Sequence, residues 1–448
     1  MNELRDYQYY VLNELLDKKK AGMFLDMGLG KSRIAIELLM LLQRPCTLIV
    51  APAMVVKTTW EQEFAKWDPD AKVKIVTGTP IKRKLMFEMN DADVYVLSRD
   101  NVDWLWKSFG KKLHFDVVIL DESSSFKNPS SKRWKAIRYY CNDAERVIEM
   151  TGTPVGNSMI DLWGQIELIC PGRLGKFMEY KQKYFTGPTI NGYQVYNKIR
   201  RGAEEFINDS IKDLVFSMKS ADHLKLPERI DNLIEIKMDS KLMNRYKIMR
   251  KHYVLEADNA IVTAANAAVV TGKLCQLSNG FVYDNDKKVI EFSRHKLEWL
   301  EEIFSTSQEN ILVFAMFQRD IEEIEKLGAV KLNSDKRIKE FQEGKIKYAV
   351  CHPSSIGYGI NLQQNCHTLI WYSLPWSLEQ YTQGNGRLYR QGQEHNVTIN
   401  HLITDGTIES QIYEALQSKS LTQDKLIDAC KLQIEESKTD KIPKHNLW

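Results

Sequence analysis

The sequence lacks the cysteine pattern of a metal site or a disulfide framework. Its seven cysteines are scattered along the chain and form no CxxC pair, so the spacing of structural zinc sites is excluded. An odd, dispersed set of cysteines predicts reduced thiols in an intracellular protein.

Membrane signals are absent as well. The opening residues MNELRDYQYY are polar, which predicts no signal peptide. The apolar run IAIELLMLL is interrupted by Glu37 and followed by Gln43 and Arg44, so it is too short to cross a bilayer. We therefore expect a cytoplasmic protein with no membrane partner.

The chain also lacks a strong net charge. Lysine and arginine number 62 against 59 acidic residues, for a formal charge of +3, so composition alone does not indicate a nucleic-acid binder and any anion-binding surface must be local. No solenoid-type repeat or low-complexity tract is present. A chain of 448 residues with 43% hydrophobic content therefore predicts two domains of roughly 200 residues each.

Apolar runs of strand length recur in both halves, with helical segments between them. They are AGMFLD, CTLIVAP, VKIVTG, ADVYVLS, FDVVILDE and ERVIEMTGTP in the first half, and ILVFAMF, AVKLN, YAVCHP, HTLIWYS and VTINHLIT in the second. The runs are continuous rather than alternating, which is typical of strands buried on both faces. Alternation of strand and helix predicts an α/β fold with two parallel sheets.

Residues 155 to about 300 interrupt this rhythm. The hydrophobic period favours helix for most of them, including residues 242–270, while Asn191-Gly192 predicts a hairpin turn. Pro227 marks the expected crossover between the domains. The predicted organisation is a first domain at 1–228 with a helical protrusion from about 155, a second domain at 229–437 with a helical insertion at about 240–300, and a polar tail at 438–448.

The strongest local motif is FLDMGLGKS, residues 24–32. An apolar strand leads into a glycine turn, and a helix follows it, so backbone amides at Gly28 and Gly30 can approach phosphate oxygens at a helix N-terminus. Lys31 would reach the β and γ phosphates and the Ser32 hydroxyl would bind Mg²⁺. Leu25 stands where the strict motif has glycine, and an ordinary structural turn is the alternative.

Two further patterns carry charge that a nucleotide site would use. In FDVVILDESSSFKN a buried strand ends in Asp121 and Glu122, where open α/β sheets bind ligands. Asp121 would hold the metal and Glu122 would orient and deprotonate the attacking water. In QGNGRLYRQGQ, residues 383–393, Arg387 and Arg390 share a face if the segment is helical. No acidic residue occurs within residues 383–393, so this pair is either a surface salt-bridge face or a site for an anion.

The order of these motifs resembles the Swi/Snf family of ATP-driven DNA translocases in helicase superfamily two. LRDYQ resembles its adenine-reading motif, LIVAPAMVVKTTWEQEFAKW its phosphate-contacting motif, and TGTPVGNSMIDLW the motif coupling ATP state to DNA grip. ILVFAMFQRDIEEIE, SSIGYGINLQ and SLPWSLEQYTQGNGRLYRQGQ match the motifs of the second domain, and the compact layout is similar to phage and prophage motors. The resemblance implies two RecA-like domains, ATP and Mg²⁺ as cofactors, and a bacterial or phage-infected cell.

The resemblance also implies roles for individual residues. The expected nucleotide-binding residues are Arg5, Gln8, Met27, Gly28, Leu29, Gly30, Lys31, Ser32 and Gly359. The expected catalytic residues are Lys31, Asp121, Glu122, Gln383, Arg387 and Arg390, with Ser32 and Asp121 as ligands of Mg²⁺. The expected DNA contacts are Pro52, Lys57, Thr58, Ser98, Arg99, Gln318, Ser354, Ser355 and Trp376. By contrast, Trp60, Phe64 and Trp67 repeat at helical spacing, which predicts core packing.

Ser124 departs from the family, which has histidine there to link the ATP site with the second domain. The leading hypothesis is a DNA-stimulated ATPase that translocates on double-stranded DNA, remodelling it or displacing bound protein. The expected partner is double-stranded DNA, or forked or single-stranded DNA. The alternatives are a strand-separating helicase on forked or branched DNA or on RNA, and a nucleotide-gated motor subunit of a larger defence or recombination complex. A small-molecule kinase would leave Arg387 and Arg390 without a role.

Overall fold

The structure, a computed structural model, describes residues 4–155, 158–190, 193–196, 198–223, 226–252, 254–257, 260–263, 267–355 and 361–429. Contacts between residues divide the chain into two compact units. The first unit contains the residues up to 224 and those from 421 onward, and the second contains residues 225–420. The described cysteines are all free thiols. Of the helices described, none combines the length and apolar character that crossing a bilayer requires.

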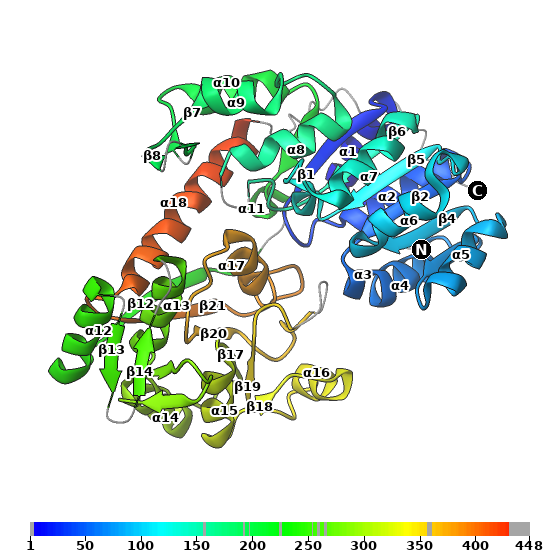
Figure 1. Ribbon diagram of the computed structural model, residues 1–448. Helices are drawn as coiled ribbons and strands as arrows, with labels where there is room; N and C mark the ends of the chain where they lie inside the picture. Colours follow the sequence, from blue (N-terminus) through cyan, green and yellow to red (C-terminus); the bar gives the residue numbers. More distant parts are fainter. Residues whose placement is uncertain are drawn as a thin grey trace. The chain divides into compact units, whose positions relative to one another are not determined.

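Within the described residues, the first unit is built around a parallel sheet of seven strands (Figure 1). In spatial order these are β11 (Val215–Met218), β1 (Lys20–Leu25), β6 (Arg146–Met150), β5 (Val117–Asp121), β2 (Thr47–Ala51), β4 (Val94–Ser98) and β3 (Val73–Val76). All neighbours run parallel. The strands β2, β4 and β5 are buried along their whole length, which explains their continuous apolar sequence. Only β11 was not predicted from sequence.

Helices cover both faces of this sheet, because the chain moves along the strand order in one direction from β1 to β3 and in the other from β3 to β11, while each crossover stays right-handed. One group comprises α1 (Asp6–Asp17), α2 (Lys31–Leu41), α3 (Ala53–Thr58) and α4 (Trp60–Trp67). The other comprises α5 (Pro80–Glu88), α6 (Val102–Phe109), α7 (Lys132–Asp143) and α8 (Ile160–Ile169), with the short 3₁₀ turns η1 (Arg99–Asn101), η2 (Gly110–Lys112) and η3 (Ser123–Phe126). Within the groups α2 packs on α1 and α4, and α7 packs on α6 and α8.

The predicted protrusion follows α8. Its elements are α9 (Phe177–Tyr184), β7 (Phe185–Thr186), β8 (Thr189–Ile190), β9 (Tyr193–Gln194), β10 (Lys198–Ile199) and α10 (Ala203–Ile211), and α11 (Ser220–His223) follows β11. The strands β8 and β9 pair antiparallel on either side of Asn191-Gly192, in the register that the predicted hairpin requires; the two turn residues lie outside the described residues. Tyr180 is buried and donates its hydroxyl to the carbonyl of Met159 at 2.7 Å, which anchors the protrusion to the core.

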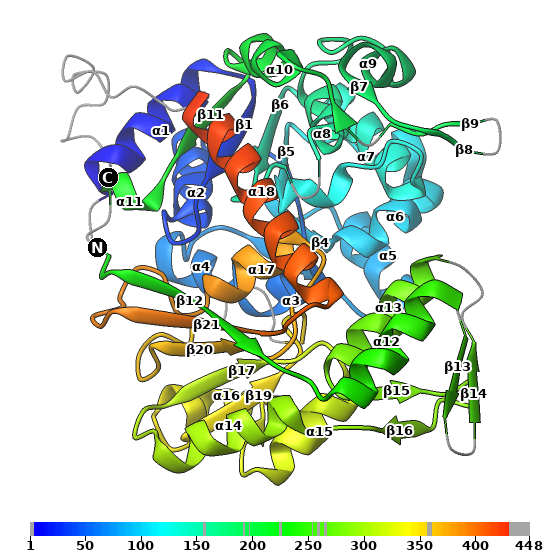
Figure 2. The same cartoon turned by 90° about the vertical axis from the view of Figure 1, so that its left-hand side faces the viewer.

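The second unit has its own parallel sheet, with six strands in the part of the chain that the structure describes (Figure 2). In spatial order these are β12 (Arg229–Ile236), β21 (Val397–Thr404), β20 (Thr368–Trp371), β17 (Ile311–Phe314), β19 (Tyr348–Cys351) and β18 (Val330–Lys331), all parallel. The helices that cover the sheet are α14 (His295–Thr306), α15 (Gln318–Lys326), α16 (Asp335–Gln342), α17 (Leu378–Asn385) and α18 (Ile408–Ala429), the last of which belongs to this unit up to residue 420. Each face of the sheet has its own apolar core: α14 and α15 contribute to one, and α16, α17 and α18 to the other. The expected α/β fold with two RecA-like parallel sheets is confirmed.

The insertion of the second unit differs from the prediction of a continuous helix over residues 242–270. The structure has α12 (Ser240–His252), an antiparallel pair β13 (Val254–Ala257) and β14 (Ala260–Thr263), and then α13 (Ala267–Ser278). A second antiparallel pair, β15 (Phe281–Tyr283) and β16 (Val289–Glu291), follows. The helical expectation was therefore wrong for the middle of the segment, where β-branched residues in AIVT favour strand over helix.

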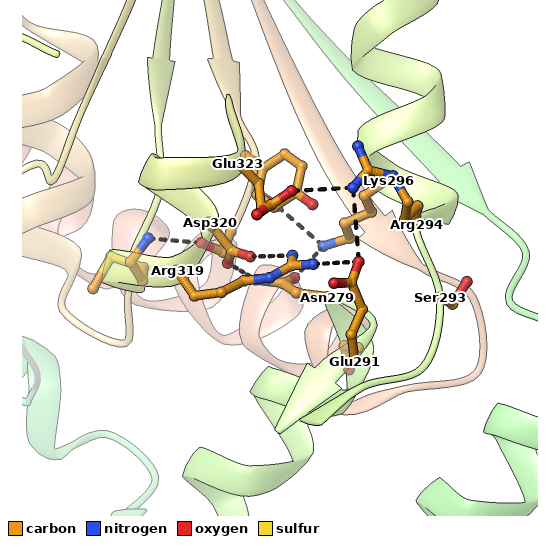
Figure 3. Close-up of polar contacts among 12 residues, drawn as sticks. Asn279, Glu291, Ser293, Arg294, Lys296, Arg319, Asp320 and Glu323 are labelled. Atoms are coloured by element: carbon orange, nitrogen blue, oxygen red, sulfur yellow. Dashed lines mark hydrogen bonds and ion pairs between the residues drawn. The ribbon is translucent and has the colours of Figure 1, made fainter. Parts of the chain in front are cut away.

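A buried polar network ties this insertion to the second sheet (Figure 3). The ammonium of Lys296, at the start of α14, is fully buried and bonds Glu409 at 2.6 Å and the side chain of Asn279 at 2.9 Å. The Asn279 amide donates in turn to Asp320 at 2.6 Å. Burial raises the pKa of Asp320 to about 7, although the charge of Arg319 acts against it. Lys296 thus joins the residue after α13 to Glu409 of α18, and Asn279 extends the network to Asp320 of α15.

Glu149 is a buried carboxyl that this fold leaves without a partner in the part of the chain described. It lies on β6, is 0% exposed, and neither oxygen accepts a hydrogen bond. Burial raises its pKa well above the ordinary value, so the folded state holds it as the neutral acid. When folding raises the pKa of a glutamate, the free energy of unfolding falls as pH rises from the unfolded pKa to the folded pKa. The unfolded chain releases a proton in this range, and the folded chain retains it.

We expect Glu149→Gln to remove this pH dependence while keeping the side-chain size. The wild-type free energy of unfolding should fall by about 1.4 kcal/mol per pH unit from this residue, from about pH 4.3 up to its folded pKa. Thermal midpoints measured between pH 5 and 8 should show Glu149→Gln gaining on wild type as pH rises. Glu145→Gln, at the exposed residue directly before β6, should show no such gain. Parallel curves for wild type and Glu149→Gln would contradict the buried neutral acid.

Candidate functional site

The predicted phosphate-binding loop joins β1 to α2. Gly28 and Gly30 have φ values of 84° and 79°, in the left-handed region that glycine adopts without strain. Gly30 is constrained a second time, because a Cβ there would lie 2.4 Å from the side-chain nitrogen of Gln8. The N-terminus of α2 therefore follows a glycine turn with left-handed backbone at Gly28 and Gly30, which is the arrangement of an anion site.

Lys31 begins α2 and lies folded against this loop. Its ammonium donates to the carbonyls of Leu25 at 2.8 Å and Asp26 at 3.3 Å. The loop after β6 lies alongside, since a Cβ on Gly152 would be 3.3 Å from the Leu25 carbonyl and 3.7 Å from the Lys31 ammonium. The TGTP motif and the glycine loop therefore touch at neighbouring strand ends, as the ligand edge of a parallel sheet requires.

The start of α1 supports the same loop. Gln8 donates to the carbonyl of Leu29 at 3.2 Å, and Tyr7 donates its hydroxyl to that carbonyl at 3.2 Å. Gln8 also accepts from the backbone amide of Arg5 at 3.0 Å. The predicted nucleotide-binding residues Arg5 and Gln8 thus lie at the predicted phosphate loop, and Gln8, the predicted base contact, bonds the loop directly.

Asp121, the predicted metal ligand, is the last residue of β5 and is 8% exposed. Its Oδ2 accepts a hydrogen bond from the indole Nε1 of Trp60 at 3.0 Å. Burial raises the pKa of Asp121, while the Trp60 hydrogen bond and the charges of Lys31 and Arg99 act in the opposite direction. Trp60 is therefore more than the core residue that its helical spacing predicted.

Glu122 occupies strained backbone. Its φ and ψ are 54° and 57°, a left-handed conformation that costs a residue with a Cβ about 1–3 kcal/mol and is concentrated at functional sites. The next residue, Ser123, donates to Gln165 at 3.0 Å, and Gln165 donates to the carbonyl of Pro154 at 2.8 Å. The acidic motif and the TGTP motif are thus bridged by Gln165 of α8. Ser124, at the family's histidine position, is buried and its hydroxyl has no hydrogen-bond partner among the described residues.

The predicted DNA contacts of the first unit follow β2 and β4, beside the strands that carry the nucleotide residues. Pro52 precedes α3 directly and is buried. Ser98 is 7% exposed, and its hydroxyl accepts the amide of Asp100 at 3.3 Å. Arg99 is partly buried. Lys57 and Thr58 lie in α3, but their side chains are outside the described part of the structure, so their contacts remain predictions.

The arginine motif of the second unit is tightly supported. Asn385, at the end of α17, accepts from the indole of Trp371 at 2.9 Å. Gln393 donates to the carbonyls of Cys366 and Leu388 at 3.1 and 3.3 Å. The loop between these supports carries Arg387 and Arg390, so both arginines extend from fixed backbone.

The two arginines differ in their surroundings. Arg387 is 6% exposed. Burial raises the pKa of Cys351 and the charge of Arg387 acts against that shift, which places Arg387 near the end of β19. Arg390 is partly buried, and burial lowers its pKa. Within the described residues the Arg390 guanidinium has no hydrogen bond or ion pair. Gln383, predicted beside them, is 8% exposed and donates to Glu379 at 3.3 Å.

The remaining predicted contacts follow β17, β19 and β20, at the corresponding edge of the second sheet. Gln318 is exposed and bonds Glu322 at 2.8 Å. Ser354 and Ser355 are exposed, and Ser354 accepts from Gln380 of α17 at 2.7 Å. Trp376 is 46% exposed. Gly359 lies outside the described residues.

The predicted metal ligands of the first unit are two oxygen-bearing side chains, those of Ser32 and Asp121. Among the described residues no cluster of three or more His, Cys, Asp and Glu side chains could hold an ion. Ser32 and Asp121 instead provide one hydroxyl and one carboxylate, which fits Mg²⁺, a hard cation usually bound through one or two carboxylates together with substrate phosphates and water.

Sequence reasoning missed the roles of Trp60 and Gln165. Both act through hydrogen bonds to residues far along the chain, and no local spacing predicts such pairs. The signal available was weak: a tryptophan at the start of a helix after a strand end, and a glutamine among apolar residues in IDLWGQIELI.

Two family models match the chain. One, described as an SNF2-related domain, matches residues 7–279, and the other, described as a helicase conserved C-terminal domain, matches residues 295–392.

Full-length similarity extends to a phage protein. Protein p41 of Acyrthosiphon pisum secondary endosymbiont phage 1 is 30% identical over 452 residues, covering 95% of this chain and 98% of that protein. The SWI/SNF chromatin-remodeling complex subunit snf22 of Schizosaccharomyces pombe is 25% identical over 96% of this chain, which spans only 28% of snf22. The Sulfolobus solfataricus SWI2/SNF2 ATPase core in complex with double-stranded DNA aligns with a TM-score of 0.46 at 22% identity, covering 95% of this chain and 93% of that chain.

Proposed function

The chain belongs to the SNF2-related family of helicase-like ATPases in helicase superfamily two, and we propose that it is a DNA-stimulated ATP hydrolase that translocates on double-stranded DNA. Translocation would remodel the DNA or displace protein bound to it. The observation that carries the proposal is the convergence of three predicted motifs, the glycine loop, Asp121-Glu122 and the TGTP loop, at the ends of adjacent strands β1, β5 and β6.

In this proposal each group has a separate task. Amides of the glycine loop and Lys31 bind the phosphates, and Gln8 contacts the base. Ser32 and Asp121 hold Mg²⁺, which supplies charge neutralisation at the phosphates when bound. Glu122 orients the attacking water and accepts its proton, because phosphoryl transfer depends on positioning and electrostatics more than on covalent chemistry.

The second unit would complete the site. Arg387 and Arg390 would stabilise the charge that develops on the γ-phosphate, and Gln383 would assist them. Loops after β2, β4, β17, β19 and β20 would bind the phosphate backbone of DNA, through groups that fix orientation without reading sequence. If DNA brings the two units into the reactive arrangement, hydrolysis becomes dependent on DNA.

The test is ATP turnover by the full chain with and without duplex DNA. We expect duplex to raise kcat, and Lys31→Ala to lose turnover in both conditions because the phosphates lose their ammonium contact. Lys111→Ala, an exposed lysine of η2, is the matched control and should behave as wild type. The proposal would be overturned if duplex DNA left the rate of ATP turnover unchanged, or if Lys31→Ala kept its turnover.

The nature of the movement needs a separate measurement. Displacement of a triplex-forming strand without separation of a forked duplex is the result expected for a translocase. Strand separation of forked DNA without triplex displacement would support the helicase alternative and exclude translocation on duplex.

A further inference from the structure

The hydrogen bond between Trp60 and Asp121 has a geometry that core packing alone does not explain. Trp60 is 0% exposed, and its ring packs 6.0 Å from that of Phe64, as the helical spacing predicts. Its indole N–H nevertheless points at Asp121 Oδ2, at 3.0 Å, and the two residues come from different elements. An apolar residue of similar size would fill the same volume without this contact.

Trp60 and Asp121 can meet because α4 follows strand β2, and β2 is the neighbour of β5 in the sheet. β2, whose C-terminal loop leads into α3 and α4, pairs with β5 along its length, with Val50 opposite Leu120. Paired strands are about 4.8 Å apart. The first residue of α4 therefore reaches across one strand spacing to the end of β5.

The other end of α4 is fixed on α2. The guanidinium of Arg33 lies 4.0 Å from the ring of Trp67, and Arg33 pairs with Glu37 at 2.8 Å. The indole of Trp67 donates to Glu63 at 3.0 Å. Since α2 begins with Lys31 and Ser32, α4 is held at one end to the helix of the phosphate loop and at the other to the carboxylate of β5.

We infer that Trp60 is a positioning residue that fixes the carboxylate of Asp121 for the Mg²⁺ of bound Mg·ATP. The inference rests on the proposed function, in which Asp121 binds that ion. A carboxylate held through Oδ2 by a buried N–H cannot rotate freely, so the direction of Oδ1 is set before the metal arrives. Mg²⁺ demands near-ideal octahedral geometry, and removing a hydrogen-bond partner of a metal ligand typically lowers metal affinity or activity 10- to 100-fold.

The competing explanation is that Asp121 merely satisfies a buried indole N–H, which tryptophan requires. Under that explanation, loss of the N–H would lower stability but leave the dependence on Mg²⁺ unchanged. Trp134 provides the matched control in the same unit. It is 4% exposed and donates its indole N–H to the carbonyl of Gly164 at 2.8 Å, so Trp134→Phe removes a buried indole hydrogen bond that does not involve Asp121.

The experiment is a Mg²⁺ titration of the full chain, monitored by binding of N-methylanthraniloyl-ADP. Trp60→Phe should raise the Mg²⁺ concentration for half-maximal enhancement of nucleotide binding about 10-fold, while nucleotide affinity without Mg²⁺ stays that of wild type. Trp134→Phe should leave the titration unchanged. Equal titrations for Trp60→Phe and wild type would overturn the inference.

Two additions separate the remaining outcomes. If Asp121→Asn also leaves the titration unchanged, the proposed metal site itself is wrong; if Asp121→Asn shifts it and Trp60→Phe does not, only the inference is wrong. Should Trp60→Phe fail to fold, the inference is tested by NMR of the wild-type chain with ¹⁵N-labelled tryptophan indoles. The indole resonance that moves in Asp121→Asn must also move when Mg²⁺ is added to the ADP-bound chain, and an unmoved resonance would overturn the inference.

Discussion

Replacing Arg390 by alanine is expected to lower DNA-stimulated ATP turnover about 10³- to 10⁵-fold, the range of arginine fingers in related phosphoryl-transfer enzymes. At about 1.4 kcal/mol per decade this corresponds to about 4–7 kcal/mol of transition-state stabilisation. The physical reason is that the guanidinium of Arg390 is partly buried without a counter-charge among the described residues of the second unit. Burial lowers the pKa of Arg390, and no described residue compensates its charge. Such a cation is costly until it meets an anion, and the developing charge on the γ-phosphate would supply one.

The measurement separates binding from chemistry. ATP affinity, from equilibrium binding, should remain near wild type in Arg390→Ala, while kcat falls. Arg250→Ala removes an exposed arginine of α12 in the same unit and should leave both quantities unchanged. A loss of ATP affinity as large as the loss of turnover would show that Arg390 binds the ground state instead of acting as a finger.

The two sheets were predictable because their strands are continuous apolar runs. The two missed strands are exceptions to that pattern. β11, with the sequence VFSM, is short, and β12, with the sequence RIDNLIEI, is largely exposed along its length. Both follow helical segments, so the dominant period around them favours helix. The strands β13 and β14 were missed for the same reason, since apolar residues of α12 and α13 on either side suggested a single helix.

The candidate site divides by the range of its interactions. The glycine loop, Lys31 and Asp121-Glu122 are local patterns. They could be predicted because strand, loop and helix follow one another in the sequence around them. The contact of Trp60 with Asp121 spans 61 residues, and that of Ser123 with Gln165 spans 42. Such pairs depend on which strands become neighbours and in what register, which local spacing does not contain.

The bridge through Gln165 also changes the meaning of Ser124. In the family resemblance, histidine at that position links the ATP site to the second domain. Here the neighbouring Ser123 makes the connection from the acidic motif to Gln165 and on to the Pro154 carbonyl. The acidic motif is thus joined to the TGTP motif, which the resemblance associates with DNA grip, without a histidine.

Glu122→Gln is expected to lower maximal ATP turnover about 10²- to 10⁴-fold, the usual contribution of a positioned general base. Glutamine keeps the length and shape of the side chain, so the left-handed backbone at φ 54° and the adjoining Ser123 hydrogen bond need not change. The substitution therefore removes the ability to accept the proton of the attacking water while leaving the surrounding structure in place. ATP and Mg²⁺ binding should stay at wild-type values, in contrast to Asp121→Asn.

Single-turnover hydrolysis with ATP prebound measures this step directly. Glu61→Gln, an exposed glutamate of α4, is the control and should hydrolyse at the wild-type rate. Because the strain at Glu122 persists only if the surrounding structure enforces it, thermal stability should be nearly equal in wild type and Glu122→Gln. A variant that is equally stable, binds Mg·ATP and still hydrolyses it at the wild-type rate would transfer the role of base to another residue. A variant that stops binding Mg·ATP would make Glu122 a ligand of the metal or the phosphates rather than the base.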